Sequence, residues 1–407
     1  MSTQSDVSPG LQPALRLLAA APHRLMFFIG ACNVLAAMTW WAFWLAGVSV
    51  APLAVPGPML HAWLMQYLVL PAFMFGFLLT VFPRWLGLGA AQGWHYVPVG
   101  LGLVSAQALT LVAAWSGSGL ALWLGWINTL AAWLTGLVIL AGWLWRDRDG
   151  DWHARSALAA MGFGLIGVIL FGLGLYRQDA AWWRMSSAVA TFGLLVPVYV
   201  TVAHRMFPFF AANVVAGYRP WKPRFLLPIM WLGSLGHLVL DVSGHAAWRA
   251  APDLFLAGMG FVMLWRWWPR NEAPPLLRVL FIGFGWWPVA MSLFATDALL
   301  QAAGSGISLG RAPLHALAIG FFGSLLVAMV TRVTAGHSGR PLLLGPTAAF
   351  AFAGMHALAL LRMAADFVPN PLPLWVASAF GWLVLFLPWV LRSCFVYLSP
   401  RVDGRAG

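Results

Sequence analysis

The chain alternates between long apolar runs and short polar breaks from one end to the other. Each run is about 20 residues long, which is enough for a helix to cross roughly 30 Å of hydrocarbon. Twelve such runs are counted, at about 25–47, 59–83, 94–115, 119–145, 155–175, 182–203, 225–246, 250–268, 276–297, 312–333, 343–366 and 372–398. The pattern predicts an all-α, polytopic integral membrane protein with about twelve transmembrane helices.

The first apolar run follows a polar segment and is too long for the core of a signal peptide, so we expect it to be retained as a span. The breaks between runs are short, and none is long enough for a domain outside the membrane. We therefore expect an N-terminal segment at 1–24, a single transmembrane domain at 25–398 and a C-terminal tail at 399–407.

The composition agrees with a membrane protein, and the distribution of charge predicts how the protein is oriented in the membrane. The 407 residues are 61% hydrophobic and 8% charged, with a net charge of +12, whereas roughly a quarter of a soluble domain is charged. With twelve spans, most Lys and Arg fall on the side of the termini. The opposite side holds only Arg177, Arg184, Arg249, Arg311 and Arg362. Cytoplasmic loops carry the excess of positive charge, so the pattern predicts cytoplasmic termini and a charge that anchors the protein in the membrane instead of binding nucleic acid.

Carboxylates and thiols are scarce within the spans. Asp241 is the one acidic residue that the pattern places inside a span, which disfavours a proton-coupled transporter and carboxylate-ligated metals. The two cysteines, Cys32 and Cys394, fall in separate spans. Their positions indicate neither a disulfide framework nor a CxxC metal site.

Histidines are the candidate ligands. His61 in the second run and His315 in the tenth occupy matching depths in the outer half of the membrane. Two imidazoles from separate helices can hold a haem from both faces, or a copper ion. The alternative is a hydrogen bond between helices. His237 and His356 lie in the middle-to-outer half of their spans, where a ligand role and a packing role are equally compatible with the pattern.

A second group of polar residues lies at the cytoplasmic level. Arg205 follows the sixth run, Arg332 lies near the end of the tenth, and His337 belongs to the Gly-His-Ser-Gly-Arg turn just after it. An arginine fork suits haem propionates, another anion or the carbonyls at helix C-termini. Plain positive-inside anchoring explains these cations equally well.

Three segments resemble one family. HALAIGFFGSLLVAMVTRVTAGHSGR at 315–340, HAWLMQYLVLPAFMFGFLLTVFPRWLG at 61–87 and AHRMFPFFAANVV at 203–215 are similar to motifs of the NnrS family, which are bacterial inner-membrane proteins containing haem and copper and linked to denitrification and the nitric oxide response. The resemblance implies haem, leaves copper open as a further metal, and implies a location in the cytoplasmic membrane. His61 and His315 begin two of the matching segments, so the resemblance implies them as haem ligands, while His237 and His356 stay candidate metal ligands on their positions in the spans. Arg205, Arg332 and His337 form a separate cytoplasmic-side cluster that could bind haem propionates or another anion.

The chain departs from the family pattern in two places. Trp63 and Leu64 stand where the family often has a second histidine and a glutamate, which weakens a two-metal model. His204 replaces a glycine before Arg205, as expected of a divergent subgroup. The topology is also similar to that of the catalytic subunit of haem-copper oxidases and nitric oxide reductases, but Leu317 stands where that subunit has a second histidine in span ten. Shared topology does not transfer chemistry.

Three functions remain open at this point. The first is a haem protein that acts on nitric oxide or relieves its effects, with an activity like that of nitric oxide reductase and a quinol or a cytochrome as electron donor. In that case His61 and His315 cannot both ligate one reactive iron. The second is a non-enzymatic sensor or carrier of haem or copper that uses the same histidines. The third is a transporter of a small solute.

Overall fold

The computed structural model describes residues 11–48, 51–147 and 150–404, and its regular elements are all helices. Twelve helical segments follow the twelve predicted runs, and a short helix, α1 (Leu11–Leu18), precedes them within the predicted N-terminal segment. Residues 1–10 of the predicted N-terminal segment and residues 405–407 of the predicted C-terminal tail lie outside the described part of the chain.

The helical segments are continuous in most spans and subdivided in three. The single helices are α2 (Pro22–Leu45), α5 (Gly93–Ser116), α6 (Gly119–Trp145), α7 (Trp152–Arg177), α10 (Leu226–Val242), α11 (Ala250–Trp267), α12 (Pro275–Ala302), α15 (Pro346–Ala364) and α16 (Leu372–Tyr397). The subdivided segments are α3 (Gly57–Trp63), η1 (Leu64–Val69) and α4 (Leu70–Trp85); α8 (Ala180–Ala188), η2 (Val189–Leu195) and α9 (Val196–Val214); and α13 (Ala312–His315), η4 (Ala316–Gly323) and α14 (Ser324–His337). Two short 3₁₀ turns, η3 (Ala246–Arg249) and η5 (Ala365–Phe367), complete the described elements.

Ten of these segments are long and apolar enough to cross a membrane. The two that fall outside this group are α10, which is apolar but has 17 residues, and α11. The all-α membrane fold is therefore confirmed. The predicted count of twelve spans matches the number of helical segments, and ten of them meet the length and hydropathy expected of a span.

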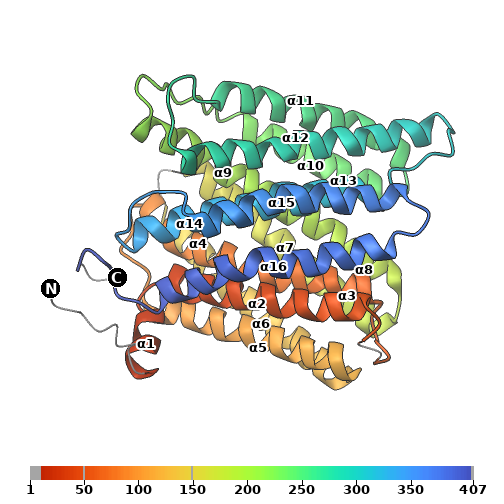
Figure 1. Cartoon of the computed structure of the whole chain (residues 1–407), viewed down its shortest axis with the longest axis horizontal. Coiled ribbons are helices and arrows are strands. Elements are labelled where there is room, and N and C mark those ends of the chain that lie inside the picture. Colours follow the sequence, from red (N-terminus) through yellow and green to blue (C-terminus); the bar gives the residue numbers. More distant parts are fainter. Residues whose placement is uncertain (1–10, 49–50, 148–149, 405–407) are drawn as a thin grey trace.

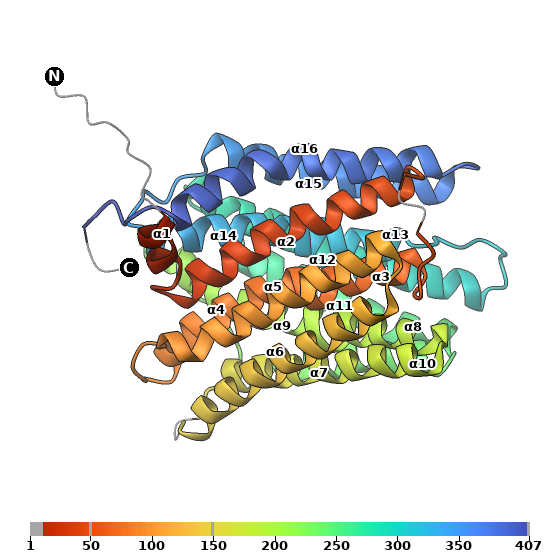
Figure 2. The ribbon, with the colours of Figure 1, turned by 90° about the horizontal axis from the view of Figure 1, so that it is seen from below.

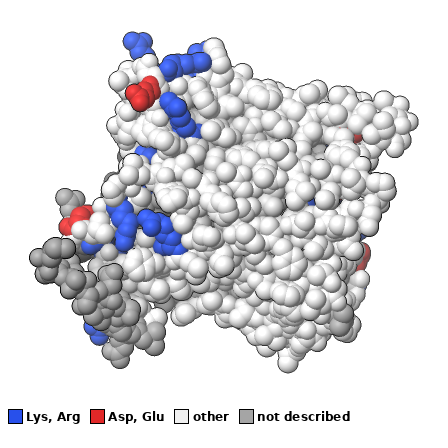
Figure 3. Space-filling model, viewed as in Figure 1, with Lys and Arg blue, Asp and Glu red and all other residues white. Residues whose placement is uncertain are grey.

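The helices run side by side along the long axis of the molecule (Figures 1 and 2). The first described helix and the end of α16 lie at the same end, where Arg24 donates hydrogen bonds to the Tyr397 and Ser399 carbonyl oxygens at 3.2 and 3.0 Å. Lys and Arg gather at this end in Figure 3. We call it the basic end and its opposite the far end. The placement of the basic end in the cytoplasm stays a prediction.

The three subdivided segments each contain a π-helical stretch, and they are spans two, six and ten. In η1 and η2 the cause is visible in the sequence, because Pro71 and Pro197 follow within two residues. A proline inside a helix removes one N–H and crowds the carbonyl of residue i−4, and a wider turn relieves that contact. The freed Tyr67 carbonyl accepts a hydrogen bond from the Trp133 indole at 3.1 Å. Because π-helical turns occur frequently at functional sites, spans two, six and ten are candidate locations for a functional site.

Candidate functional site

His61 lies near the far end, in α3, the short helix that precedes η1. Its ring stacks on Trp41 of α2, with ring centroids 4.4 Å apart and planes inclined by 14°. Its Nδ1 is buried and has no hydrogen-bond partner among the described residues. A buried polar atom without a partner is costly. His61 is therefore fixed in orientation by an aromatic contact while its nitrogen stays available to a ligand.

His315 is the last residue before η4, so both histidines lie at the far-end side of a π-helical stretch. Its Nδ1 lies 2.9 Å from the Arg311 carbonyl oxygen. A carbonyl only accepts, so Nδ1 carries the proton and Nε2 of the neutral ring keeps a lone pair. Metal-ligating histidines commonly donate their other N–H to a carbonyl in this way. The backbone thus prepares His315 to bind a metal through Nε2.

The two histidines share one electrostatic environment. Each is close enough to Arg311 and Arg362 to interact with both, and His315 also interacts with His61. Arg362 already contacts Asp366 at 3.3 Å and Trp375, whereas Arg311 forms no ion pair with a carboxylate among the described residues. This part of the far end therefore combines two neutral imidazoles with unbalanced positive charge, which suits an anionic cofactor.

His237 has a different environment, although it lies in the same half of the bundle. Its Nδ1 is 2.6 Å from Oδ1 of Asp253, and both side chains are almost completely buried, at 1% and 0% exposure. The ring also stacks on Phe192, with centroids 3.6 Å apart. The Asp253 carboxylate pairs with Nδ1 and fixes the ring. This pairing fits a structural role, and it also fits a ligand role through Nε2, because metal-ligating histidines commonly donate their other N–H to a carboxylate.

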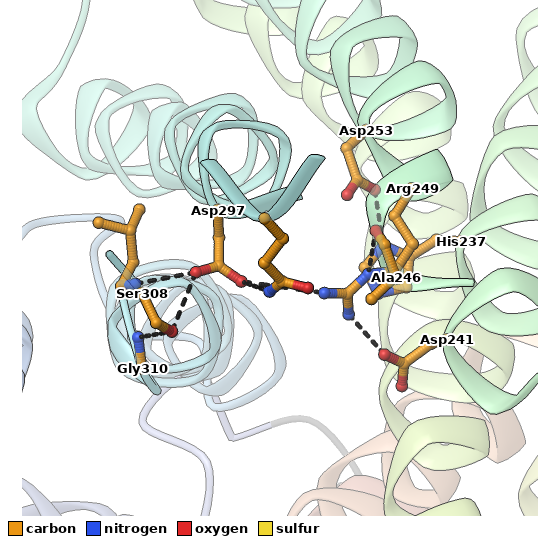
Figure 4. Close-up of polar contacts among 10 residues, drawn as sticks. His237, Asp241, Ala246, Arg249, Asp253, Asp297, Ser308 and Gly310 are labelled. Carbon is orange, nitrogen blue, oxygen red and sulfur yellow. Dashed lines mark hydrogen bonds and ion pairs between the residues drawn. The ribbon is translucent and has the colours of Figure 1, made fainter. Parts of the chain in front are cut away.

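The His237–Asp253 pair continues into a polar network across α10, η3 and α12 (Figure 4). Arg249 binds Asp241 at 2.5 Å and lies 3.9 Å from Asp297. Asp297 in turn accepts hydrogen bonds from Gln301 and from the Leu309 backbone N–H. The network ties the far-end connections to the helices that they join.

The sequence-based view of the carboxylates was wrong for this region. It placed Asp241 alone within a span. Asp253 and Asp297 do lie near helix ends, in the first turn of α11 and five residues before the end of α12, but they are buried, at 0% and 6% exposure, and Asp241 is the most exposed of the three. The available signal was the short connection between α10 and α11. It brings His237, Arg249 and Asp253 within one helical hairpin, where a turn-end acid can face a histidine.

His356 contacts span ten indirectly, because Trp286 lies between them. The Trp286 indole N–H donates to His356 Nδ1 at 2.6 Å, and Gly320 of η4 packs so closely on Trp286 that a Cβ there would lie 2.5 Å from the ring. Because Nδ1 accepts, the neutral ring carries its proton on Nε2, which is buried without a partner in the described chain. In this tautomer His356 offers a donor and no lone pair, so it is poorly prepared to ligate a metal.

At the basic end, two other histidines form a chain of hydrogen bonds. His204 Nε2 is 3.2 Å from the Pro223 carbonyl and must donate to it, so His204 Nδ1 accepts from His153 Nε2 at 2.9 Å. His153 Nδ1 is then the acceptor for Arg205 at 3.4 Å. Every ring nitrogen of this pair has a partner. The chain joins α7, α9 and the 215–225 connection and needs no ligand.

Asp151, the N-cap of α7, completes this cluster. It accepts a hydrogen bond from the Ala154 backbone N–H at 2.8 Å and binds Arg205 at 2.5 Å. Burial by itself would raise the pKa of the Asp151 carboxyl, but the Ala154 hydrogen bond and Arg205 outweigh it and hold the pKa below its ordinary value. Asp151 therefore stays ionised and keeps Arg205 in place over Trp85.

Arg332 and His337 have separate partners, so the three polar residues expected at this level do not contact one another in the described chain. The Arg332 guanidinium lies 4.0 Å from the centre of the Phe210 ring. The His337 ring packs on His23, with centroids 4.2 Å apart, and its carbonyl accepts from Arg401. Gly339 adopts a φ of +72°, which agrees with a glycine-shaped turn.

The described residues suit haem better than a copper centre built from protein side chains. They contain no group of three or more His, Cys, Asp or Glu side chains that could hold a metal ion, and the familiar protein sites for copper use about three or more ligands. Haem needs only one or two imidazoles because the porphyrin supplies four nitrogens. The two free imidazoles of His61 and His315 meet that requirement.

The comparisons with known proteins give one match. A family model described as NnrS protein matches residues 17–401, which is nearly the whole chain. No curated protein matches the chain. The match spans all twelve helical segments, including the three with π-helical stretches.

Proposed function

Because the chain belongs to the NnrS family, a family of haem- and copper-containing membrane proteins related to nitric oxide, we propose that it binds haem through His61 and His315 at the far end of the bundle and acts on nitric oxide there, with one of the two imidazoles giving up the iron when nitric oxide binds. The observation that carries the proposal is the state of these two rings. His61 Nδ1 is buried without a partner, and the Arg311 carbonyl leaves His315 with a free Nε2 lone pair.

Haem, when bound, would supply an iron that can bind imidazole or a diatomic molecule. The chain supplies what surrounds it. Trp41 holds the His61 ring by stacking, the Arg311 carbonyl holds the His315 ring, and the Arg311 guanidinium provides positive charge for a propionate. Arginine is well suited to a carboxylate because its fork can form two parallel hydrogen bonds. Copper has no comparable donor set here, so no step is assigned to it.

An absorption spectrum of the purified, haem-reconstituted protein tests the proposal. We expect a Soret band in the wild type and a large loss of haem per folded protein in His61→Ala or His315→Ala. If both rings ligate one iron, each variant also changes the spin state of what haem remains. Unchanged haem content and spectrum in both variants would remove the ligand assignment.

A non-enzymatic sensor or carrier would use the same two histidines. Turnover separates it from an enzyme that reduces nitric oxide. With a quinol or a reduced cytochrome as donor and without oxygen, an enzyme consumes nitric oxide, and the consumption disappears with His61→Ala. Haem binding without consumption favours the sensor or carrier.

A transporter of a small solute was disfavoured by the expected lack of buried acids, and that argument no longer holds in full because Asp253 and Asp297 are buried. The Asp253 carboxylate is paired with His237, and the Asp297 carboxylate with Arg249 and Gln301. This pairing is the arrangement of a fixed structural network. Solute uptake into proteoliposomes that fails with Asp253→Asn, in a protein without a Soret band, would support the transporter instead.

A further inference from the structure

A large cavity lies at the basic end, beside the His153–His204 pair. Its volume is about 890 Å³, and its walls come from the end of α4, the start of α7, α9 and the connection between α9 and α10. The proposed haem site does not use this cavity, because His61 and His315 lie toward the opposite end of the bundle. The cavity is therefore a second candidate binding site.

Cations outnumber carboxylates on the walls of this cavity. The described part of its lining has four cations and two carboxylates, namely Arg84, Arg205, Lys222, Arg224, Asp147 and Asp151. Asp151 binds Arg205 and caps α7, and Asp147 accepts a hydrogen bond from the Asp151 backbone N–H at 2.7 Å. The other three cations form no hydrogen bond or ion pair among the described residues. They give the cavity positive charge that these carboxylates do not neutralise.

Arg205 is held in a fixed position at the cavity wall and has donors to spare. Its Nη1 donates hydrogen bonds to Asp151 Oδ2 and His153 Nδ1, and the guanidinium lies 4.3 Å from the centre of the Trp85 ring. Its other nitrogens form no hydrogen bond within the described chain. A guanidinium carries five N–H donors in a rigid fork, so Arg205 keeps donors for an anion in the cavity.

The His153–His204 pair positions two of the other cations. His204 is completely buried, and its Nε2 donates to the Pro223 carbonyl oxygen at 3.2 Å. Lys222 and Arg224 are the residues on either side of Pro223, and both line the cavity. His153 in turn holds His204 through a hydrogen bond of 2.9 Å. Because the backbone between the two cations is anchored, less ordering is required when a ligand binds.

We propose that this cavity binds the phosphate group of a larger molecule. Arginine forks and lysine ammonium groups are common partners of phosphate oxygens, and several cations around one cavity suit a group with more than one negative charge. The volume is much larger than one phosphate. Trp152 and Phe209, at 48% and 52% exposure, add apolar surface to the walls for the rest of the molecule.

Two sources share this chemistry, the headgroup of an acidic phospholipid and a soluble organic phosphate. Both bring phosphate oxygens to the same cations, and they differ in whether acyl chains are attached. The proposal rests on the cavity and its lining residues alone. It is therefore independent of the haem assignment and of which side of the membrane the basic end faces.

The test uses the full-length protein, purified in detergent and stripped of lipid, with two probes. In the first arm, native mass spectrometry counts bound cardiolipin, with zwitterionic phosphatidylcholine as the comparison lipid. In the second arm, inorganic pyrophosphate is titrated into the same protein in a calorimeter at low salt, where attraction between exposed charges is least screened. Binding of cardiolipin assigns the lipid source, and binding of pyrophosphate without cardiolipin assigns the soluble source.

A triple variant tests the site itself. Arg84→Gln, Lys222→Gln and Arg224→Gln together remove the three cations that have no carboxylate partner. We expect the variant to bind the probe that the wild type binds at least about tenfold more weakly, because each cation near an anionic group contributes to its attraction. All three side chains are exposed, so the fold should survive, which size-exclusion chromatography and circular dichroism check.

The matched control removes the same charge near the same end but outside the cavity. It carries glutamine at three exposed arginines that do not line the cavity, Arg16, Arg278 and Arg392. Its affinity for the probe should differ from that of the wild type by less than about twofold, because solvent and salt screen distant exposed charges. Equal losses in the two triple variants, or a wild type that binds neither cardiolipin nor pyrophosphate, would overturn the proposal.

Discussion

Two pairs of histidines from separate helices lie at opposite ends of this protein, and their hydrogen bonding differs. At the basic end, His153 and His204 pass hydrogen bonds in one direction from Arg205 to the Pro223 carbonyl. At the far end, His61 has no hydrogen-bond partner among the described residues, and His315 has one that leaves Nε2 free. A buried imidazole whose nitrogens are all satisfied is part of the scaffold. A buried imidazole with a nitrogen that has no partner in the chain is available to a ligand from outside the chain.

His237 sharpens this comparison because it is almost completely buried and its Nδ1 is paired with the Asp253 carboxylate. We expect His237→Leu to have the largest effect on stability, about 3–5 kcal/mol, because it leaves the Asp253 carboxylate buried without its partner. Haem per folded protein should stay at the wild-type level. Denaturation of the detergent-solubilised protein, followed by circular dichroism, measures the loss.

The control is the double variant His237→Leu with Asp253→Leu. Replacing both members of a buried pair by apolar residues is often close to neutral, so the double variant should recover most of the lost stability. If His237→Leu is as stable as the wild type but loses haem, then His237 belongs with His61 and His315.

We expect a substitution in the His153–His204 pair to lower stability without changing haem binding. His204→Ala removes the acceptor of His153 and the donor to Pro223, and a buried polar group left without a partner costs about 1–3 kcal/mol. The haem spectrum should not change. His245→Ala, at an exposed histidine that contacts Ser243, is the matched control and should cost less than about 0.5 kcal/mol. A lost Soret band in His204→Ala would place a cofactor at the basic end.

Acid should destabilise the basic end by protonating the Asp151 carboxylate. Its carboxyl has a lowered pKa in the folded protein, so it contributes stability above the ordinary value of 3.8 and loses that contribution as the pH falls through the lowered folded value. Asp151→Asn should therefore lower the melting temperature at neutral pH by a few degrees, with the difference from the wild type shrinking in acid. A difference that grows in acid would contradict the role of Arg205.

His356 should give the smallest effect. His356→Phe removes one hydrogen bond from Trp286, which is worth about 1 kcal/mol, and keeps an aromatic ring beside Phe352 and Trp286. We expect haem content and spectrum like those of the wild type. A spectral change in this variant, with stability preserved, would show that the ring takes up the other tautomer and contacts the cofactor.

The sequence predicted the helices well because lipid allows few alternatives. Each backbone polar group must be satisfied inside hydrocarbon, so hydropathy alone located all twelve segments, and the positions of His61 and His315 could be compared by counting along spans. The π-helical stretches were not predicted, because a proline alone does not specify one: Pro98, Pro288 and Pro388 lie inside continuous α-helices. At Pro71 the Tyr67 carbonyl also has a partner on another helix, Trp133. Contacts between distant helices, such as Trp286 with His356, are equally invisible in a single sequence.

The central claim is that the far end holds a haem by two imidazoles that the chain itself leaves without partners. The direct measurement is the haem content and Soret spectrum of the reconstituted wild type beside His61→Ala, His315→Ala and the scaffold control His204→Ala, each normalised to folded protein. The account predicts that haem falls by about tenfold or more in the first two, as expected where a ligand bond is lost, and stays unchanged in the third. Haem binding that survives in both His61→Ala and His315→Ala, or that is lost in His204→Ala, would contradict it.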